Sequence, residues 1–179
     1  MGKLITREEQ QLENTWDLTT IFKSDDDFEA AYKSLESKID DNDQFKNGFD
    51  SAEKLADALE LERSLDTELG QLFVYAHLKH DQDTSNDTYS ALESRARSLA
   101  VKYSTAWSFL VPAIMAVPEE TLKAYAEHER LSEFKFDLEK LNKQRPHILS
   151  DKEEQILAQA GEVMHTPTQV YGMFNNADV

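Results

Sequence analysis

The stretch that decides the fold is LADALELERSLDTELGQLFVYAHLKH, residues 55–80. Its apolar side chains recur every three or four residues, which is the period of one face of an α-helix. The spacing predicts a helix over residues 51–79, about 43 Å long at roughly 1.5 Å per residue. A helix of that length needs partners along its side. Its predicted buried stripe comprises Leu55, Leu59, Leu65, Leu69, Leu72, Phe73 and Ala76.

The segment DTYSALESRARSLAVKYSTAWSFL, residues 87–110, repeats the helical period. The polar residues 81–87 predict a turn, and a second long helix is expected over 86–110, disturbed at its end by Pro112. Two helices joined by a short turn form an antiparallel hairpin. The predicted fold is therefore all-α, an elongated helical bundle built on this hairpin. The buried face of the second helix comprises Tyr89, Leu92, Ala96, Leu99, Tyr103, Ala106, Trp107 and Leu110.

On the N-terminal side, Ser24 followed by three aspartates predicts a helix start, because serine caps a helix and acidic residues complement its dipole. The helix is expected over 25–39. Residues 1–24 are expected to form a lead-in and anchor segment. An apolar cluster within this segment is expected to hold it against the helices; its members are Trp16, Leu18, Ile21 and Phe22.

On the C-terminal side, Pro118 predicts the first turn of a helix, and the run 131–143 predicts another. A capping box opens a further helix from Ser150 to about Ala160, and Thr166–Gln169 repeats that pattern. We expect residues 25–179 to form one helical domain.

Composition limits the function. The chain has 35 acidic and 19 basic residues, a net charge of −16, which argues against nucleic-acid binding and against an anionic membrane surface. No cysteine is available for disulfides or thiolate ligands. The polar N-terminus lacks the apolar core of a signal peptide. No stretch approaches the roughly 20 apolar residues that a membrane helix needs.

His77 and His80 are the most metal-like residues, because histidines three apart on a helix meet on one face and Asp81 and Asp83 follow. The favoured interpretation is structural, since both histidines lie near the C-terminal, negative end of a helix dipole. The run Asp81–Ser85 begins like a calcium loop, but the glycine and glutamate that such a loop needs are missing. A polar capping turn explains it better.

Arg145 and His147 flank a proline and are suited to hold a peptide carboxylate or an oxyanion, although a structural turn is favoured. The adjacent pairs Glu119–Glu120 and Glu153–Glu154 are not catalytic dyads, because neighbours on a helix do not face each other. Three aromatic residues are candidates for lining a peptide channel, for the core, or for contacts with another domain: Tyr125, Tyr171 and Phe174.

Four segments together resemble the opening of the M3-family oligoendopeptidase F peptidases, in family order and spacing. They are NTWDLTTIF (14–22), VYAHLKHDQDT (74–84), SFLVPAI (108–114) and RPHILS (145–150), the last followed by Glu153–Glu154 and 175–178. The resemblance implies the helical N-terminal region of a cytoplasmic, zinc-dependent enzyme that cleaves short peptides. It also implies that this region walls the substrate channel or acts as a lid.

The His-Glu-x-x-His motif that would supply zinc ligands and a general base does not occur in residues 1–179. We therefore expect the longer protein to hold the zinc and this chain alone to be inactive, with no metal bound. No residue is assigned a catalytic or metal-binding role, and the substrate-binding residues stay unidentified. The expected partners are the catalytic domain of the same protein and short peptides, not nucleic acid or membrane.

The alternative is a stand-alone acidic helical module that binds a partner protein. The apolar C-terminal run that begins at Tyr171 favours a piece of a longer protein, because self-contained domains usually end in polar residues. An apolar face left without its partner is expected to promote self-association.

Overall fold

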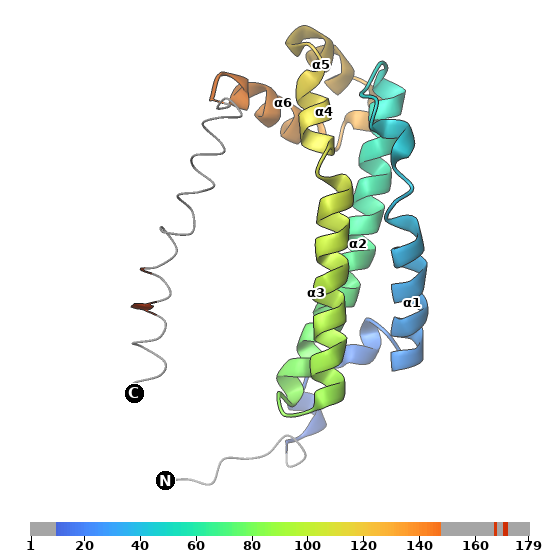
Figure 1. Ribbon diagram of the computed structural model, residues 1–179, viewed down its shortest axis with the longest axis vertical. Coiled ribbons are helices and arrows are strands. Elements are labelled where there is room, and N and C mark those ends of the chain that lie inside the picture. The colour runs from blue at the N-terminus through green and yellow to red at the C-terminus, as the bar shows by residue number, and fades with distance from the viewer. Residues whose placement is uncertain (1–9, 148–166, 168–169, 172–179) are drawn as a thin grey trace. The chain divides into compact units, whose positions relative to one another are not determined.

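A computed structural model describes residues 10–147, 167 and 170–171 (Figure 1). The chain divides into two compact units, Met1–Glu139 and Lys140–Val179. Every regular element within the described residues is helical, which confirms the all-α prediction. The α-helices are α1 (Asp25–Lys38), α2 (Ala52–Gln82), α3 (Asp87–Trp107), α4 (Leu110–Ala116), α5 (Glu119–Ala126) and α6 (Lys135–Gln144).

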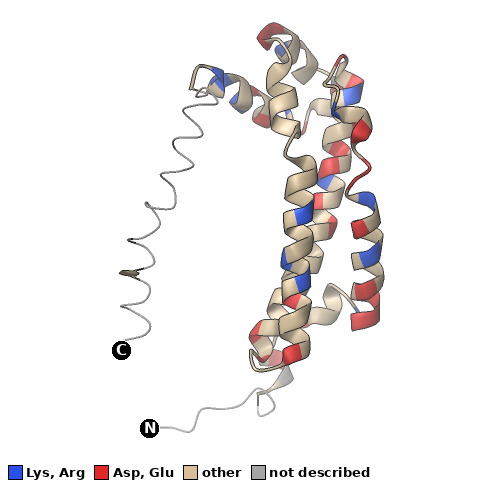
Figure 2. Ribbon diagram, viewed as in Figure 1, with Lys and Arg blue, Asp and Glu red and all other residues tan. Residues whose placement is uncertain are grey.

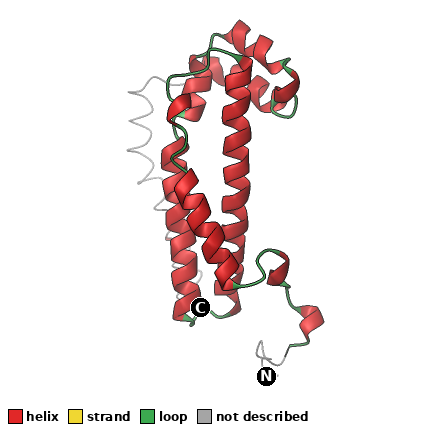
Figure 3. Ribbon diagram, turned by 90° about the vertical axis from the view of Figure 1, so that its right-hand side faces the viewer, coloured by secondary structure: helices red, strands yellow, loops and turns green. Residues whose placement is uncertain are grey.

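The hairpin of α2 and α3 forms as expected, and α1 lies alongside it (Figure 3). Ser51 caps α2 by accepting a hydrogen bond from the amide of Lys54, and Asn86 caps α3 through the amides of Thr88 and Tyr89. α2 runs three residues beyond the expected end, to Gln82. Because the helix continues to Gln82, Asp81 lies one helical turn after His77, and the two side chains pair.

The expected helix over 86–110 is in fact two helices. α3 ends at Trp107, and α4 begins at Leu110 with Pro112 in its first turn. Proline has no amide hydrogen and its ring clashes with the carbonyl four residues earlier, so a continuous helix cannot pass through it. In the first turn of a new helix the missing donor costs nothing. Pro118 likewise lies one residue before α5 and not inside it.

The core lies between α1, α2 and α3 and follows the predicted stripes closely. Leu65, Leu72 and Leu99 are almost completely buried, as their spacing indicated. Three residues of the predicted stripes are only half-buried: Phe73, which stacks on His77, Tyr89 and Ala106. Trp16 is 81% exposed, so the prediction that it helps to anchor the N-terminus is wrong. Phe22 supplies that contact, with its ring edge-on to Phe28 and Tyr75.

Polar bonds join the short elements to the long helices. The Trp107 indole donates to the carbonyl of Ile39, and the Asn42 amide donates to the carbonyl of Ala106, so the end of α1 is held against α3. Arg130 reaches back from the 3-10 turn Glu129–Leu131 to two carboxylates of α2.

α6 begins at Lys135, later than the expected 131, because the chain first turns through that 3-10 helix. Phe136 is consequently 74% exposed and not part of an apolar face. The helix expected from Ser150 to Ala160 lies outside the described residues. Of the last predicted helix, Pro167 is described and is helical, as are Val170 and Tyr171 just beyond it.

The stretch Asp87–Ala116, which is α3 followed by α4, is long and apolar enough to cross a membrane by length and composition alone. The sequence-based statement that no stretch approaches this limit is therefore wrong. One side of the stretch supplies core residues, among them Leu99 and Ile114. Charged residues occur on the long helices, whereas α4 carries none (Figure 2).

Candidate functional site

The N-terminal segment folds into a short loop that caps itself. The Asp17 carboxylate accepts bonds from the amide and the hydroxyl of Thr19, at 2.9 and 2.6 Å, and starts the 3-10 turn Leu18–Thr20. These bonds lower the pKa of Asp17. Ser24 then caps α1 by accepting from the amide of Asp27. This part of the chain thus runs directly into the N-terminus of α1.

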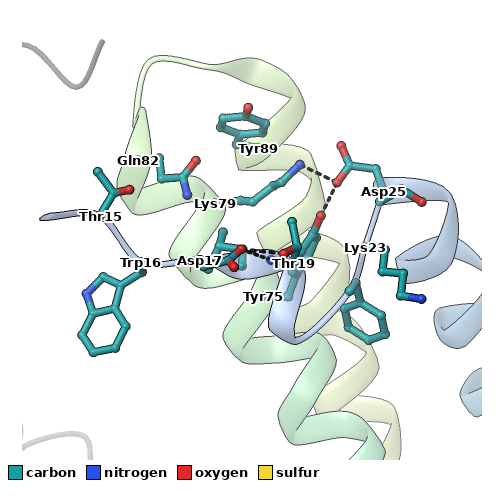
Figure 4. A pocket seen from close by; sticks show the side chains of 13 residues that line it. Thr15, Trp16, Asp17, Thr19, Lys23, Asp25, Tyr75, Lys79, Gln82 and Tyr89 are labelled. Atoms are coloured by element: carbon teal, nitrogen blue, oxygen red, sulfur yellow. Dashed lines mark hydrogen bonds and ion pairs between the residues drawn. The ribbon is translucent and has the colours of Figure 1, made fainter. Parts of the chain in front are cut away.

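A pocket of about 700 Å³ lies where this loop meets the start of α1, the last turns of α2 and the first turn of α3 (Figure 4). Its walls combine aromatic rings with charged groups. They are formed by Thr15, Trp16, Asp17, Leu18, Thr19, Phe22, Lys23, Ser24, Asp25, Tyr75, Lys79, Gln82 and Tyr89.

A three-residue network forms the centre of this pocket. Asp25 accepts the hydroxyl hydrogen of Tyr75 at 2.8 Å and the ammonium of Lys79 at 2.5 Å. The ammonium nitrogen also lies 5.2 Å from the ring centroids of Tyr75 and Tyr89, within cation–π range. The network therefore joins α1 and α2, and the Tyr89 ring links it to α3.

The network shifts the ionisation of its members. Burial raises the pKa of Tyr75, and its bond to Asp25 adds to the effect. Burial would also raise the pKa of Asp25, but the bonds from Lys79 and Tyr75 outweigh it and lower that pKa. The pKa of Lys79 is raised, because the contacts with Asp25 and Tyr75 outweigh the burial that would lower it. Asp25 and Lys79 thus stay charged and paired near neutral pH, and Tyr75 keeps its proton.

Sequence reasoning did not identify this site, because Asp25 lies 50 residues from Tyr75 and 54 from Lys79 along the chain. One signal was present: Tyr75 and Lys79 are four apart on a helix and share a face. The arrangement holds helices together and contains no activated nucleophile.

His77 and His80 do meet on one face of α2, but their common partner is Glu93 of α3. The Glu93 carboxylate accepts from His77 Nδ1 at 2.9 Å and lies 3.3 Å from His80 Nδ1. Arg97 donates to the same carboxylate at 2.6 Å. Bonds from His77 and then Arg97 lower the pKa of Glu93. The guanidinium of Arg97 pairs with Glu93 within α3, and the two histidines join the same carboxylate to α2. Sequence reasoning overlooked Glu93.

The other candidates have structural surroundings. Asp83 accepts from the amide and hydroxyl of Ser85, which makes the residues after α2 a polar turn and not a calcium loop. Glu119 and Glu120 both pair with Lys123 on the first turns of α5.

In the second unit, the Arg145 guanidinium donates to Asn142 at 2.7 Å, and His147 is exposed. Tyr125 is half-buried and Tyr171 is 69% exposed. Phe174 and the pair Glu153–Glu154 lie outside the described residues.

The described residues do not fit a zinc ion. Within residues 10–147 and the three later described positions, no group of three or more carboxylates or imidazoles is arranged to hold a metal ion. Fold and site together define an all-α domain whose polar clusters join helices to one another.

Comparison with known proteins identifies the family. A family model described as Oligopeptidase F matches residues 114–179. The chain is 35% identical to the Oligopeptidase PepF of Bacillus subtilis strain 168, over 99% of this chain and 27% of that protein. It is also 35% identical to the plasmid-borne Oligoendopeptidase F of Lactococcus lactis subsp. cremoris, over 92% of this chain and 28% of that protein. The chain belongs to the oligoendopeptidase F family and corresponds to its N-terminal region.

Solved structures agree with this assignment. A putative peptidase from Chlamydophila abortus superimposes with a TM-score of 0.79 at 25% identity, over 96% of this chain and 29% of that one. An oligoendopeptidase-F from Enterococcus faecium gives a TM-score of 0.61 at 32% identity, over 87% and 31%. The chain therefore spans less than a third of the length of each of these relatives.

Proposed function

We propose that this chain is the substrate-channel wall and lid of a cytoplasmic, zinc-dependent oligoendopeptidase that hydrolyses short peptides. The observation that carries the proposal is the 35% identity to an oligopeptidase over 99% of the chain. In this proposal the zinc and the bond-breaking step belong to the remainder of the longer protein, since the chain covers only 27% of the relative's length.

The domain then contributes selection and positioning. A helical wall beside a reaction centre admits a flexible peptide and excludes a folded protein, and it holds the peptide in a productive geometry. Rigid elements suit this role. α2 and α3 provide them, since they are long helices joined through a buried core, through the contact of Lys79 with the Tyr89 ring, and through the Glu93 cluster.

The test is a chimera in which residues 1–179 replace the aligned region of the Bacillus subtilis oligopeptidase. Cleavage is measured on fluorogenic peptides of increasing length and on a folded protein, beside the intact relative and a form lacking that region. We expect the chimera to cleave short peptides with an upper length limit, and the deletion to lose activity or that limit. Identical length profiles for chimera and deletion would contradict the proposal and favour the stand-alone interaction module.

A further inference from the structure

The composition of α3 and α4 does not match their exposure. Between Lys102 and Glu119 the chain has no charged residue, although 30% of all its residues are charged. The 18-residue window in Asp87–Ala116 that is apolar enough to span a membrane is only 28% buried. Runs of this composition normally lie in a core or an interface, because exposing apolar surface to water is unfavourable.

Five exposed residues of this stretch carry no charge, and together we call them the uncharged face: Val101, Thr105, Ser108, Val111 and Pro112. Val101 and Val111 are 67% and 50% exposed. The Thr105 hydroxyl donates to the carbonyl of Val101, and the Ser108 hydroxyl donates to that of Thr105, both at 2.9 Å. Covering the face would therefore strand neither hydroxyl without a partner.

Lys102, the charged residue next to Val101 in the chain, is directed away from this face. The ammonium of Lys102 donates to the carbonyl of Glu36 at 3.1 Å and pairs with Asp40 at 3.3 Å, so it is held toward α1. A partner that covers the uncharged face would not have to bury an unpaired charge, which is the costliest obstacle to association.

We propose that the uncharged face docks the polypeptide that follows the aligned region in full-length oligoendopeptidase F proteins. The inference rests on the proposed function. The length of the relatives indicates the occupant. The chain covers only 27% to 28% of relatives that match nearly all of it, so those proteins are more than three times longer. A second copy would bring together two chains of net charge −16. A bilayer does not suit this face, because a helix inserted in lipid would also place core residues there, such as Trp107, whose indole donates to the carbonyl of Ile39.

The chain has no cysteine, so a single engineered cysteine reports the exposure of one position. We choose Val101→Cys and Val111→Cys, with Val74→Cys on α2, 45% exposed, as the matched control. Each variant is made in the isolated chain and in the Bacillus subtilis chimera, and maleimide labelling is timed. We expect labelling at 101 and 111 to slow at least about tenfold in the chimera, with position 74 unchanged.

Unchanged labelling at both positions in the chimera would overturn the docking proposal, whether or not the chimera cleaves peptides. Protected cysteines in a chimera without length selection would support docking and contradict the proposed function. In parallel, the isolated chain is examined by sedimentation for self-association, and its cysteine labelling is timed in the presence of phosphatidylcholine vesicles. Protection by self-association or by vesicles alone would overturn the assigned occupant.

A second measurement needs no chimera. Val111→Glu in the isolated chain should leave the melting temperature unchanged, because the face is open to water there. A marked loss of thermal stability in this variant would show that the face is already covered within the chain, and would overturn the proposal.

Discussion

The hydroxyl of Tyr75 is one of two groups on α2 that bond to Asp25, the first residue of α1. It donates to Asp25 at 2.8 Å, beside the ammonium of Lys79. The Tyr75 ring is almost fully buried and packs against Phe22 and Phe28, so ring and hydroxyl make separable contributions.

Tyr75→Phe keeps the ring contacts and removes the bond to Asp25. We expect the free energy of unfolding to fall by about 1 kcal/mol, the usual net value of one hydrogen bond. Urea denaturation followed by circular dichroism measures it. Tyr89→Phe is the control, since the Tyr89 ring also faces Lys79 but its hydroxyl makes no bond among the described residues. Equal losses in both variants would mean that the bond to Asp25 contributes nothing.

Glu93 makes the stability depend on pH. Bonds from His77 and Arg97 place its folded-state pKa below the ordinary value of 4.5. A carboxyl group whose pKa is lower in the folded state stabilises the fold at pH values above its unfolded-state pKa. This contribution disappears as the pH falls through the folded-state pKa. His80 and Asp81 of α2 also face this cluster.

Glu93→Gln should therefore lose less stability than the wild type between pH 7 and pH 3, as measured by urea denaturation across that range. Glu133→Gln is the control, because Glu133 is 74% exposed in its ion pair with Arg63 and such surface pairs contribute little. If the Glu93→Gln profile runs parallel to that of the wild type, the cluster does not set the pH dependence.

At the scale of elements, two glycines have opposite roles. Gly70 lies exposed within α2, with open space where a β-carbon would point. Gly48 lies before α2 with a φ of +84°, a left-handed conformation that other residues adopt only with strain. Gly70 lowers the helix propensity of α2 without a compensating contact, whereas the turn before α2 requires Gly48.

Gly70→Ala should raise the free energy of unfolding by about 1 kcal/mol, because alanine is the better helix former. Gly48→Ala should lower it by about 1 kcal/mol or more, because its turn requires the left-handed conformation. Thermal unfolding of the two variants, compared with the wild type, gives both signs. A destabilising Gly70→Ala would show that another part of the chain lies against that side of α2.

At the scale of the whole molecule, the chain should be independent of metal. The imidazoles closest to a ligand set, His77 and His80, already share Glu93 with a guanidinium. We expect the melting temperature of the isolated chain to be the same with EDTA and with equimolar zinc, by calorimetry. A rise with zinc that His77→Ala abolishes would contradict this expectation.

The sequence alone determined the helical class, the hairpin and most of the core, because these follow from a local period of apolar residues and from caps such as Ser51 and Asn86. The four motif segments likewise indicated the family. The tertiary structure alone decided the pairing of Asp25 with Tyr75 and Lys79, the role of Glu93, and the exposure of Trp16. These features join residues distant in the chain, and no local pattern records which helix faces meet.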